Sequence, residues 1–421
     1  MNYLVVLFVS LLSVSCAGSC NPASKKAEVV KEIIRPQVSY QTIGRVCDDQ
    51  IIIDRNVDLK GGECKLPNSM TLVFKGGIVK NGTIVGNNTK IDSKGVAFDH
   101  VLIDGYWNVP VISTDLFVDL GYNNALIELF ALLNPNMHNK ITIKEGNYPI
   151  NARGEWSRIL RVGSNTDLII NGTITLQPNS YKGCDIIFVE GHDITITGKG
   201  IIKGDKHTHT GDKGEWGMGI NVHNSHNVKI KGLTIRDCWG DCIYVGTNST
   251  SVTIEDCKLM HGRRQGISVT SANRVVIRKC SISGIQGTAP EYAIDIEPNN
   301  GDTVDNVLIE RVKIRDCIGG IMTYGKAADG RVGRVEISKN DIQSNVKWAI
   351  GINTCNTLIV KGNKLRNTSC QKLIRCVNIN NVTLNSNTLR HPQLLNISSE
   401  EHMNIVDCGN VVRKNNRVKS F

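Results

Sequence analysis

The sequence predicts an all-β chain whose strands stack into a solenoid, and two repeats support that prediction. One short segment occurs four times between Gly217 and Pro298, as GMGINVH, DCIYVG, QGISVT and YAIDIEP, at spacings of 23, 24 and 27 residues. A second segment, nine residues long, occurs seven times between Asn227 and Leu389, mostly at intervals of 23 or 24 residues. Periods of this size are typical of solenoids. Because the two segments alternate, each coil contains at least two strands, and we interpret the fold as a right-handed parallel β-helix.

Each copy of the first repeat contains two aliphatic residues separated by one variable residue. The pairs are Ile220/Val222, Ile243/Val245, Ile267/Val269 and Ile294/Ile296. Residues two apart in a strand point to the same side, so these pairs should face the core. The variable residues between them should then form a row on the outer surface, and we expect the functional surface there.

The seventh position of the second repeat keeps similar residues over successive copies. In chain order it is Leu233, Cys257, Cys280, Val312, Asn340, Asn363 and Asn387. Stacked coils place such side chains about 4.8 Å apart. Three successive asparagines therefore predict a ladder of amides, and the two cysteines should be small buried residues. Cys47 and Cys64 are the pair that we retain as a candidate disulfide.

The chain ahead of the repeats changes its pattern twice. Glycines and Asn-Gly pairs separate short apolar runs between Asp58 and Gly105, which indicates β-coils. Apolar residues then recur at helical spacing within Asn123–Leu133, so we expect a short helix there. We place the N-terminal β-coils at 46–115 and the parallel β-helix at 116–421.

Three loops interrupt the period of the repeats. They lie at Gly204–Glu215, Ser283–Glu291 and Lys326–Gly333. Insertions into the coils of a solenoid often line its binding face. We therefore expect the loops to border the functional surface.

The first twenty residues have the features of an export signal. Tyr3–Val14 is apolar but too short to span a membrane, and no Lys or Arg precedes it. Cys16, after Ser-Val-Ser, and Cys20, after Ala-Gly-Ser, both resemble the lipidated cysteine of bacterial lipoproteins. We expect an exported lipoprotein of the periplasm or outer membrane, attached to the membrane by a lipid on Cys16 or Cys20. The signal region is placed at 1–20 and a polar tether at 21–45.

The chain is basic, with a formal net charge of +10 and a pI near 8.9. A charge of this sign favours an acidic partner. Nucleic acid fits poorly, because no basic run is interleaved with aromatic residues. We therefore expect no nucleic-acid partner; an anionic polysaccharide, or no specific acidic partner, fits the composition better.

The repeats resemble those of the pectin-lyase-like superfamily of right-handed parallel β-helix proteins. KITIKEGNYPI at 140–150 is similar to the start of that domain, where a preceding short helix caps the open end of the solenoid. Between Trp216 and Thr270 the resemblance is to polygalacturonases of glycoside hydrolase family 28. There WGMGINVH, WGDCIYVG and RQGISVTS resemble the family strands NTDGIDI, GDDCIAI and GHGISIGS.

That resemblance is incomplete at the catalytic positions. Asp241 stands where the family has the second aspartate of its pair, which helps to activate water. Gly240 replaces the first aspartate, the usual general acid, and Met218 replaces the aspartate of the first motif. Gln265 replaces the motif histidine. The resemblance therefore implies the fold and a role with polysaccharides, but not polygalacturonase chemistry.

Asp295 and Glu297 are the strongest catalytic candidates. Because Ile294 and Ile296 should face the core, both carboxylates should lie outward on one strand, with Cα atoms about 6.6 Å apart. Inverting glycosidases divide the acid and base roles between carboxyl groups about 6.5–9.5 Å apart, and a close like charge raises one pKa, as an acid requires. Asp241 should lie near the same face two coils earlier, about 10 Å away.

Other residues near these carboxylates are candidates for holding a sugar. Arg263 and Arg264 belong to the coil between those of Asp241 and Asp295, and a guanidinium group suits a substrate carboxylate or sulfate. Aromatic side chains nearby offer flat faces for sugar rings. The expected substrate-binding set consists of Arg263, Arg264, Gln265, Tyr244, Tyr324, Glu215 and Trp216.

These residues suggest three functions. The leading hypothesis is an inverting glycoside hydrolase without a cofactor, in which Asp295, Glu297 and Asp241 share the acid and base roles. The alternative is a polysaccharide lyase or epimerase acting on uronates, in which Arg263 or Arg264 is central and Ca²⁺ can take part. The third is a glycan-binding β-helix without catalysis.

We expect no metal site in the hydrolase. His207 and His209 form a pair without a third ligand of the kind that zinc requires. Oxygen ligands for calcium could come only from the segment after Tyr292, where Asp295 and Glu297 are followed by Asn299 and Asp302. We rank the acid-base role of the two carboxylates above this calcium site.

Overall fold

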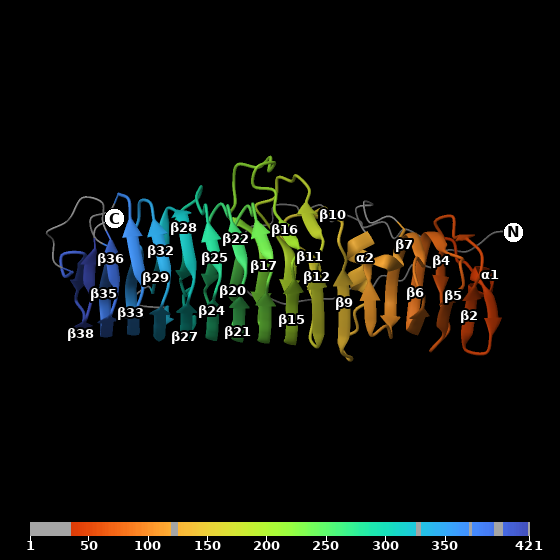
Figure 1. The fold of residues 1–421 in the computed structure, drawn as a ribbon. Coiled ribbons are helices and arrows are strands. Elements are labelled where there is room, and N and C mark those ends of the chain that lie inside the picture. Colours follow the sequence, from red (N-terminus) through yellow and green to blue (C-terminus); the bar gives the residue numbers. More distant parts are fainter. Residues whose placement is uncertain (1–34, 119–124, 326–329, 370–372, 391–398, 420–421) are drawn as a thin grey trace, which may run out of the picture. The chain divides into compact units, whose positions relative to one another are not determined.

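The computed structural model describes residues 35–118, 125–325, 330–369, 373–390 and 399–419. From Pro36 onward the chain forms one compact unit in which parallel strands stack coil upon coil (Figure 1). The helices are short: α1 (Tyr40–Ile43), the 3-10 helix η1 (Thr114–Leu116) and α2 (Ala125–Ala131). The predicted parallel β-helix is confirmed.

The strands form three sheets. The first contains β1 (Arg45–Cys47), β2 (Gln50–Ile53), β3 (Val57–Asp58), β4 (Glu63–Lys65), β5 (Thr71–Phe74), β6 (Val79–Asp92) and β7 (Phe98–Trp107). The second is one row of parallel strands: β10 (Asn147–Ile150), β13 (Thr173–Leu176), β16 (Ile201–Lys203), β19 (Thr234–Arg236), β22 (Lys258–Met260), β25 (Ser281–Ser283), β28 (Lys313–Cys317), β32 (Asp341–Ser344), β34 (Lys364–Asn367), β36 (Thr388–Arg390) and β39 (Arg417–Lys419).

The third sheet supplies two further rows. We call the first row the site face; it consists of β11 (Ser157–Val162), β14 (Gly183–Val189), β17 (Trp216–His223), β20 (Ile243–Gly246), β23 (Ile267–Val269), β26 (Tyr292–Ile296), β29 (Gly319–Tyr324), the starts of β33 (Ile350–Lys361) and β35 (Ile374–Asn385), and β37 (Met403–Val406). The other row consists of β8 (Val111–Ser113), β9 (Asn139–Ile143), β12 (Thr166–Ile170), β15 (His192–Gly198), β18 (His226–Lys231), β21 (Ser249–Glu255), β24 (Ala272–Arg278), β27 (Thr303–Glu310), β30 (Arg331–Val332), β31 (Arg334–Ser338), the ends of β33 and β35, and β38 (Asn410–Lys414).

The first sequence repeat forms β17, β20, β23 and β26 of the site face. Each of these strands pairs in parallel with the next, so that the first aliphatic residues Ile220, Ile243, Ile267 and Ile294 are aligned in register. All four are fully buried. Alternation along each strand therefore directs the intervening residues away from the core, as predicted.

The asparagine ladder is present in the second repeat. Asn340 accepts from the backbone N–H of Val312, whereas Asn363 and Asn387 each accept from both the backbone N–H and the side-chain amide of the asparagine one coil earlier, at distances of 2.8–3.1 Å. Asn416 adds a rung that the repeat did not reveal, because its oxygen accepts from the Asn387 amide at 3.0 Å. The ladder satisfies buried polar groups along the stack.

Replacing Asn363 with Ala is expected to lower the free energy of unfolding by about 2–4 kcal/mol, because it leaves several buried groups without partners. The Asn363 side chain is fully buried, and its amide also donates to the Ile337 carbonyl at 2.9 Å. Urea denaturation measures the change. The exposed Asn410→Ala variant, which loses one surface bond to Asn381, is the control and should cost less than about 1 kcal/mol. Equal losses in the two variants would contradict the role of the ladder.

The cysteines of the ladder position are buried, and their thiols donate to backbone carbonyls. Cys257 lies 3.8 Å from the Ile230 oxygen, and Cys280 lies 3.7 Å from the Ile254 oxygen. The candidate disulfide between Cys47 and Cys64 was wrong: both are free cysteines. Cys47 is exposed on β1, whereas Cys64 is fully buried on β4, so the two side chains lie in different surroundings.

The predicted helix is present as α2. Its residues Ala125, Leu126, Leu129 and Phe130 are buried, and it packs against β7 and β11. Glu128 on the same helix is also buried, and it accepts a hydrogen bond from the Ile103 N–H at 2.8 Å. The helix therefore covers the chain where the N-terminal coils meet the first strand of the site face.

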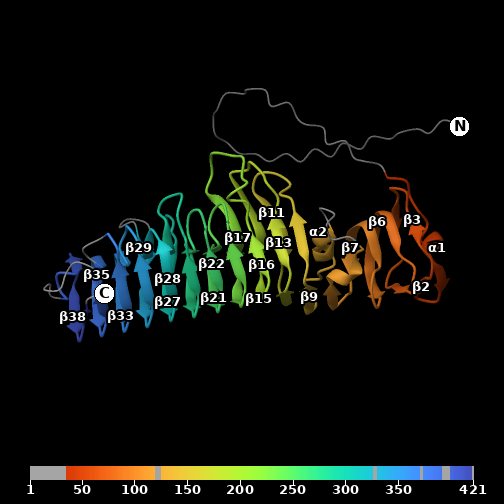
Figure 2. The same ribbon diagram turned by 45° about the horizontal axis from the view of Figure 1, so that its top comes forward.

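Two of the predicted loops border the site face. Residues 204–215 connect β16 to β17, and residues 284–291 connect β25 to β26 (Figure 2). The signal region with Cys16 and Cys20 lies outside the described residues, as does most of the predicted tether. No helix within the described ranges is long and apolar enough to cross a membrane.

Candidate functional site

The outward side chains of the site face form a row that leads to Asp295. The register aligns Arg161 with Phe188, Phe188 with Asn221, Asn221 with Tyr244, Tyr244 with Ser268 and Ser268 with Asp295. Each step is one coil of about 4.8 Å. The row thus brings residues far apart in the sequence onto one surface.

Asp295 is buried at the centre of this surface. Its side chain leaves the strand on the outer side, as predicted, but only 1% of the residue is exposed. Its Oδ2 accepts from the Gln265 amide at 2.6 Å, and Oδ1 accepts no hydrogen bond from any described residue. Burial and the neighbouring Glu297 carboxylate raise the pKa of Asp295 well above its ordinary value.

Glu297 is the half-buried partner of Asp295. Its carboxyl group lies near enough to that of Asp295 to help raise the pKa of Asp295. Asp295 therefore keeps its proton to a higher pH than an ordinary aspartate does, beside the carboxyl group of Glu297. Tyr324, 40% exposed, lies one coil beyond Glu297, because it follows Thr323, which pairs with Ile296.

Asp241 is the third carboxyl group of the site, and it is fully buried. Its Oδ2 accepts from the Ser268 hydroxyl at 2.7 Å and from Arg264 at 3.4 Å, while Oδ1 is buried without a partner in the described chain. Burial raises the pKa of Asp241, and Arg264 and Ser268 oppose that rise. We call Asp241, Asp295 and Glu297 the carboxylate cluster.

Arg264 and Gln265 hold the carboxylate cluster together. Arg264 donates through Nε to Glu215 at 2.9 Å and through Nη1 to Asp241, so it joins two of the predicted residues. The Gln265 side chain donates to Asp295 and accepts from the Tyr292 N–H at 2.7 Å. Both residues are therefore positioning residues for the carboxyl groups in this structure.

Arg263 turns away from the carboxylate cluster. Its guanidinium group stacks 3.6 Å from the centre of the Trp239 ring and donates to the Gly214 carbonyl at 2.8 Å. The other face of Trp239 stacks on His209, whose Nδ1 lies 2.8 Å from the Asp205 carboxylate. Arg263 thus anchors the loop at 204–215.

An aromatic pocket lies beside the carboxylate cluster, toward the N-terminal end of the site face. Trp216 and Trp156 are both exposed, with ring centres 5.4 Å apart. They line a pocket of about 230 Å³ together with Arg158, Asp185 and Tyr244. This arrangement offers aromatic faces next to polar groups, which is the usual composition of a ligand pocket. Tyr244 and Trp216 thus lie where a sugar could contact them.

Trp156, Asp185 and Ser268 are site residues that the sequence reasoning missed. Asp185 lies on β14, where Ile187 aligns with Ile220. Extending the pattern of aliphatic pairs back to Ile187 and Val189 would have revealed this earlier copy. No comparable signal marks Trp156, which precedes β11.

Asp185 should make stability depend on pH. Burial raises its pKa from 3.8 to about 7, against the opposing effects of Asn221 and Arg158. The folded state therefore binds this proton more tightly than the unfolded chain does, and the stabilisation is lost as the pH rises from about 4 to about 7. Relative to wild type, Asp185→Asn should become progressively more stable over that window in urea denaturation. A difference in stability that stays constant across that window would contradict this assignment.

The histidines do not form a metal pair. His207 lies 3.3 Å from Asp237, whereas His209 pairs with Asp205, so the two rings have different partners. Within the described ranges, no group of three or more His, Cys, Asp or Glu residues could hold a metal ion. After the carboxylate pair, the Asn299 amide donates to Asp302 at 3.1 Å.

Comparisons with known proteins support this fold. A family model described as "Right handed beta helix region" matches residues 157–304, which contain the carboxylate cluster and all of the aromatic pocket except Trp156. The SPbeta prophage-derived uncharacterized protein YorA of Bacillus subtilis (strain 168) is 27% identical over 304 residues, which are 65% of this chain and 49% of YorA. The chain therefore spans about half the length of this relative.

Two solved structures were found to be similar to this chain. A mutant tailspike protein of E. coli bacteriophage HK620, in complex with a pentasaccharide, has a TM-score of 0.51 at 13% identity, covering 74% of this chain and 67% of the tailspike chain. An exopolygalacturonase from Thermotoga maritima has a TM-score of 0.45 at 12% identity, covering 72% of this chain and 91% of that enzyme. At such identities the likeness is one of fold. The chain therefore has the fold of a right-handed parallel β-helix protein.

Proposed function

We propose that this protein cleaves glycosidic bonds in a polysaccharide at its carboxylate cluster. The observation that supports this most is the carboxyl group of Asp295, whose pKa is raised by burial and by the neighbouring Glu297, together with the third carboxyl group, Asp241. Acid-base cleavage of a glycoside needs carboxyl groups in different protonation states. The tailspike protein of the same fold was solved with a pentasaccharide, which supports a polysaccharide as the substrate class.

The Asp295–Glu297 pair is the proposed general acid. Asp295 holds the proton below the surface, and the half-buried Glu297 is the member that contacts the substrate. As the bond between the anomeric carbon and the glycosidic oxygen breaks, the proton passes to that oxygen through Glu297. The leaving sugar departs as an alcohol.

Asp241 is the proposed general base. It accepts a proton from a water molecule while the water oxygen bonds to the anomeric carbon. Arg264 and Ser268 favour the charged form of Asp241, as a base requires. Its coil lies two coils of about 4.8 Å before the coil of Asp295 and Glu297, which leaves room for the water that an inverting enzyme uses, so the product should have the inverted configuration.

The lyase or epimerase alternative receives less support from the arginines. Such a reaction needs a basic group that is free to take a proton next to the uronate carboxylate. Arg264 is paired with Glu215 and Asp241, and Arg263 is stacked on Trp239. Neither guanidinium group is therefore placed as a free base.

A second candidate function is glycan binding without cleavage. The observation that favours it is the burial of the carboxyl groups, since Asp241 is fully buried and only 1% of Asp295 is exposed. In this reading, the carboxylate cluster stabilises the site face, and the aromatic pocket binds the sugar. Glu297 then has no chemical role.

One experiment separates these functions. The full chain is incubated with a panel of neutral and acidic polysaccharides, and reducing ends are followed together with the ultraviolet absorbance of unsaturated products. Reducing ends alone support the hydrolase, and both signals together support a lyase. Binding without either signal would support the glycan-binding protein and contradict the proposed cleavage.

The proposal places the protein in the bacterial envelope, as an exported lipoprotein. It rests on the apolar run Tyr3–Val14 and on the cysteines that follow, Cys16 and Cys20. Mass spectrometry of the N-terminal peptide from membrane-purified protein tests it. A lipid on either cysteine supports the proposal, and an intact unprocessed N-terminus contradicts it.

A further inference from the structure

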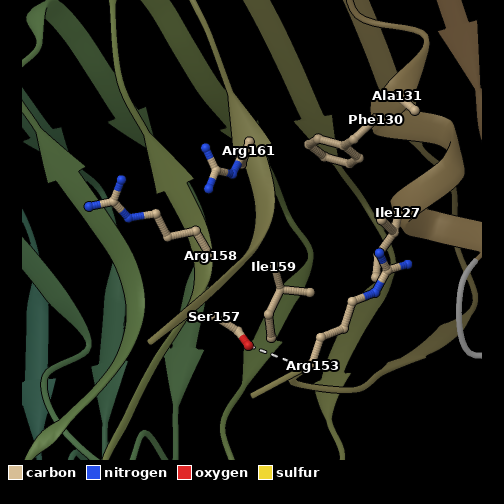
Figure 3. A pocket seen from close by; sticks show the side chains of 8 residues that line it. All are labelled: Ile127, Phe130, Ala131, Arg153, Ser157, Arg158, Ile159 and Arg161. Atoms are coloured by element: carbon tan, nitrogen blue, oxygen red, sulfur yellow. Dashed lines mark hydrogen bonds between the residues drawn. The ribbon is translucent and has the colours of Figure 1, made fainter. Parts of the chain in front are cut away.

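A second pocket lies at the N-terminal end of the site face. It has a volume of about 360 Å³, within the range of about 300–1,000 Å³ that is usual for ligand pockets. Three arginines line it, Arg153, Arg158 and Arg161 (Figure 3). Ile127 and Phe130 of α2 and Ile159 of β11 supply apolar surface between them. We call it the arginine pocket.

The arginine pocket carries an excess of positive charge. Arg153 lies 3.9 Å from the buried Glu128, whose other oxygen accepts from the Ile103 N–H. Arg158 stacks 3.9 Å from the centre of the Phe188 ring, and Arg161 lies 6.0 Å from the same ring. Within the described part of the chain, neither Arg158 nor Arg161 forms an ion pair within 4 Å. Both guanidinium groups can therefore offer N–H donors to an anion, although Arg158 also stacks on Phe188 and favours the charged form of Asp185.

The chemistry of this pocket selects an anionic ligand with an apolar face. A guanidinium group presents a planar fork that matches the two oxygens of a carboxylate or the oxygens of a sulfate. The isoleucines and Phe130 suit the C–H surface of a ring that carries such a group. An acidic sugar residue has both features.

The arginine pocket belongs to the same surface as the carboxylate cluster. Arg161 begins the row that ends at Asp295, five coils away, which corresponds to about 24 Å. Arg158 also lines the aromatic pocket of Trp156 and Trp216, which lies between the other two sites. The three sites therefore form one continuous track along the stacking direction.

We propose that the arginine pocket binds an acidic sugar residue that bears a carboxylate or a sulfate. This sugar lies several sugar residues along the polysaccharide from the glycosidic bond that is cleaved at the carboxylate cluster. The position of the cleaved glycosidic bond rests on the proposed function, whereas the binding of an acidic sugar in the arginine pocket is independent of it. The protein would then select acidic polysaccharides by a contact remote from the reacting atoms.

The test measures binding in the full chain with Asp295→Asn present, so that cleavage does not interfere. The probes are an alginate hexasaccharide with its carboxyl-reduced form, and a chondroitin sulfate hexasaccharide with its carboxyl-reduced, desulfated form. Isothermal titration calorimetry measures the affinity of each probe for the Asp295→Asn protein. The same measurement is made on two further versions, one that also carries Arg161→Gln and one that also carries both Arg158→Gln and Arg161→Gln. A control pair, Arg274→Gln with Arg311→Gln, removes the same charge from exposed positions outside the site face.

We expect at least one acidic probe to bind, with an affinity about tenfold lower in Arg161→Gln and about 100-fold lower in the double variant, since the loss of one charged hydrogen bond costs about a factor of ten or more. The neutral probe should bind equally in all versions, and the control pair should lose less than threefold. Absent binding of both acidic probes, equal losses for neutral and acidic probes, or equal losses in the control pair would each overturn the inference. Arginine-dependent binding without cleavage by wild type would uphold it and contradict only the proposed function.

Discussion

Replacing Asp295 with Asn is expected to slow glycan cleavage by about three orders of magnitude, within the range of about 10²–10⁴ that a positioned acid contributes. Asparagine has the same shape and can still accept from the Gln265 amide, which lies 2.6 Å from the Asp295 oxygen. It cannot hold the proton that Asp295 holds, so the loss should fall on kcat. The release of reducing ends measures the rate, with Asp407→Asn as an exposed control.

The pH dependence of cleavage gives a second readout of the same prediction. A general acid is active while it is protonated, so activity should fall as the pH rises through its pKa. Burial and Glu297 raise the pKa of Asp295 well above its ordinary value, so the fall should lie clearly above the pH at which an ordinary aspartate, with a pKa of about 3.9, loses its proton. Nearly full activity in Asp295→Asn would remove this residue from the mechanism.

Replacing Arg264 with Met is expected to lower the free energy of unfolding by about 3–5 kcal/mol, because it leaves the fully buried Asp241 without its cation. Arg264 is itself only 18% exposed, so solvent screens the pair weakly. Glu215, with 34% of its side chain exposed, should contribute less, and Glu215→Gln should cost about 1 kcal/mol or less.

A second substitution distinguishes the loss of the ion pair from a loss of packing. Asp241→Asn removes the charge that Arg264 balances, so Arg264→Met with Asp241→Asn should recover much of the stability lost in Arg264→Met. Urea denaturation of the two single variants and the double variant gives the coupling energy. If the losses in the free energy of unfolding of the two single variants simply add in the double variant, the charge of Asp241 is not what Arg264 stabilises.

The sequence was sufficient to predict which residues face the core. The aliphatic pairs alternate with variable residues along single strands, and their period repeats from coil to coil, so Ile294 and Ile296 could be placed from their neighbours alone. The ladder at Asn363 follows from the same periodicity. These features depend on local alternation and on a fixed spacing, and both can be read directly from the chain.

The surroundings of the outward residues could not be predicted in the same way. Asp295 is buried and accepts from Gln265 of the preceding coil, and the effect of Glu297 on its pKa depends on the orientation of two side chains. Arg263 and Arg264 are adjacent in the sequence, yet one stacks on Trp239 and the other reaches Asp241. Periodicity gives the strand and the side of a residue, but not its partners.

The most direct test of the account is a crystal structure of the Asp295→Asn variant with an oligosaccharide that the wild-type protein cleaves. We expect the sugar chain to lie along the site face, with a glycosidic oxygen about 2.6–3.2 Å from the Glu297 carboxyl group. A proton is transferred over a distance of this size. A water molecule should lie within hydrogen-bond distance of Asp241, beside the anomeric carbon. A sugar chain bound with its glycosidic bonds away from Glu297 and Asp241 would contradict the account.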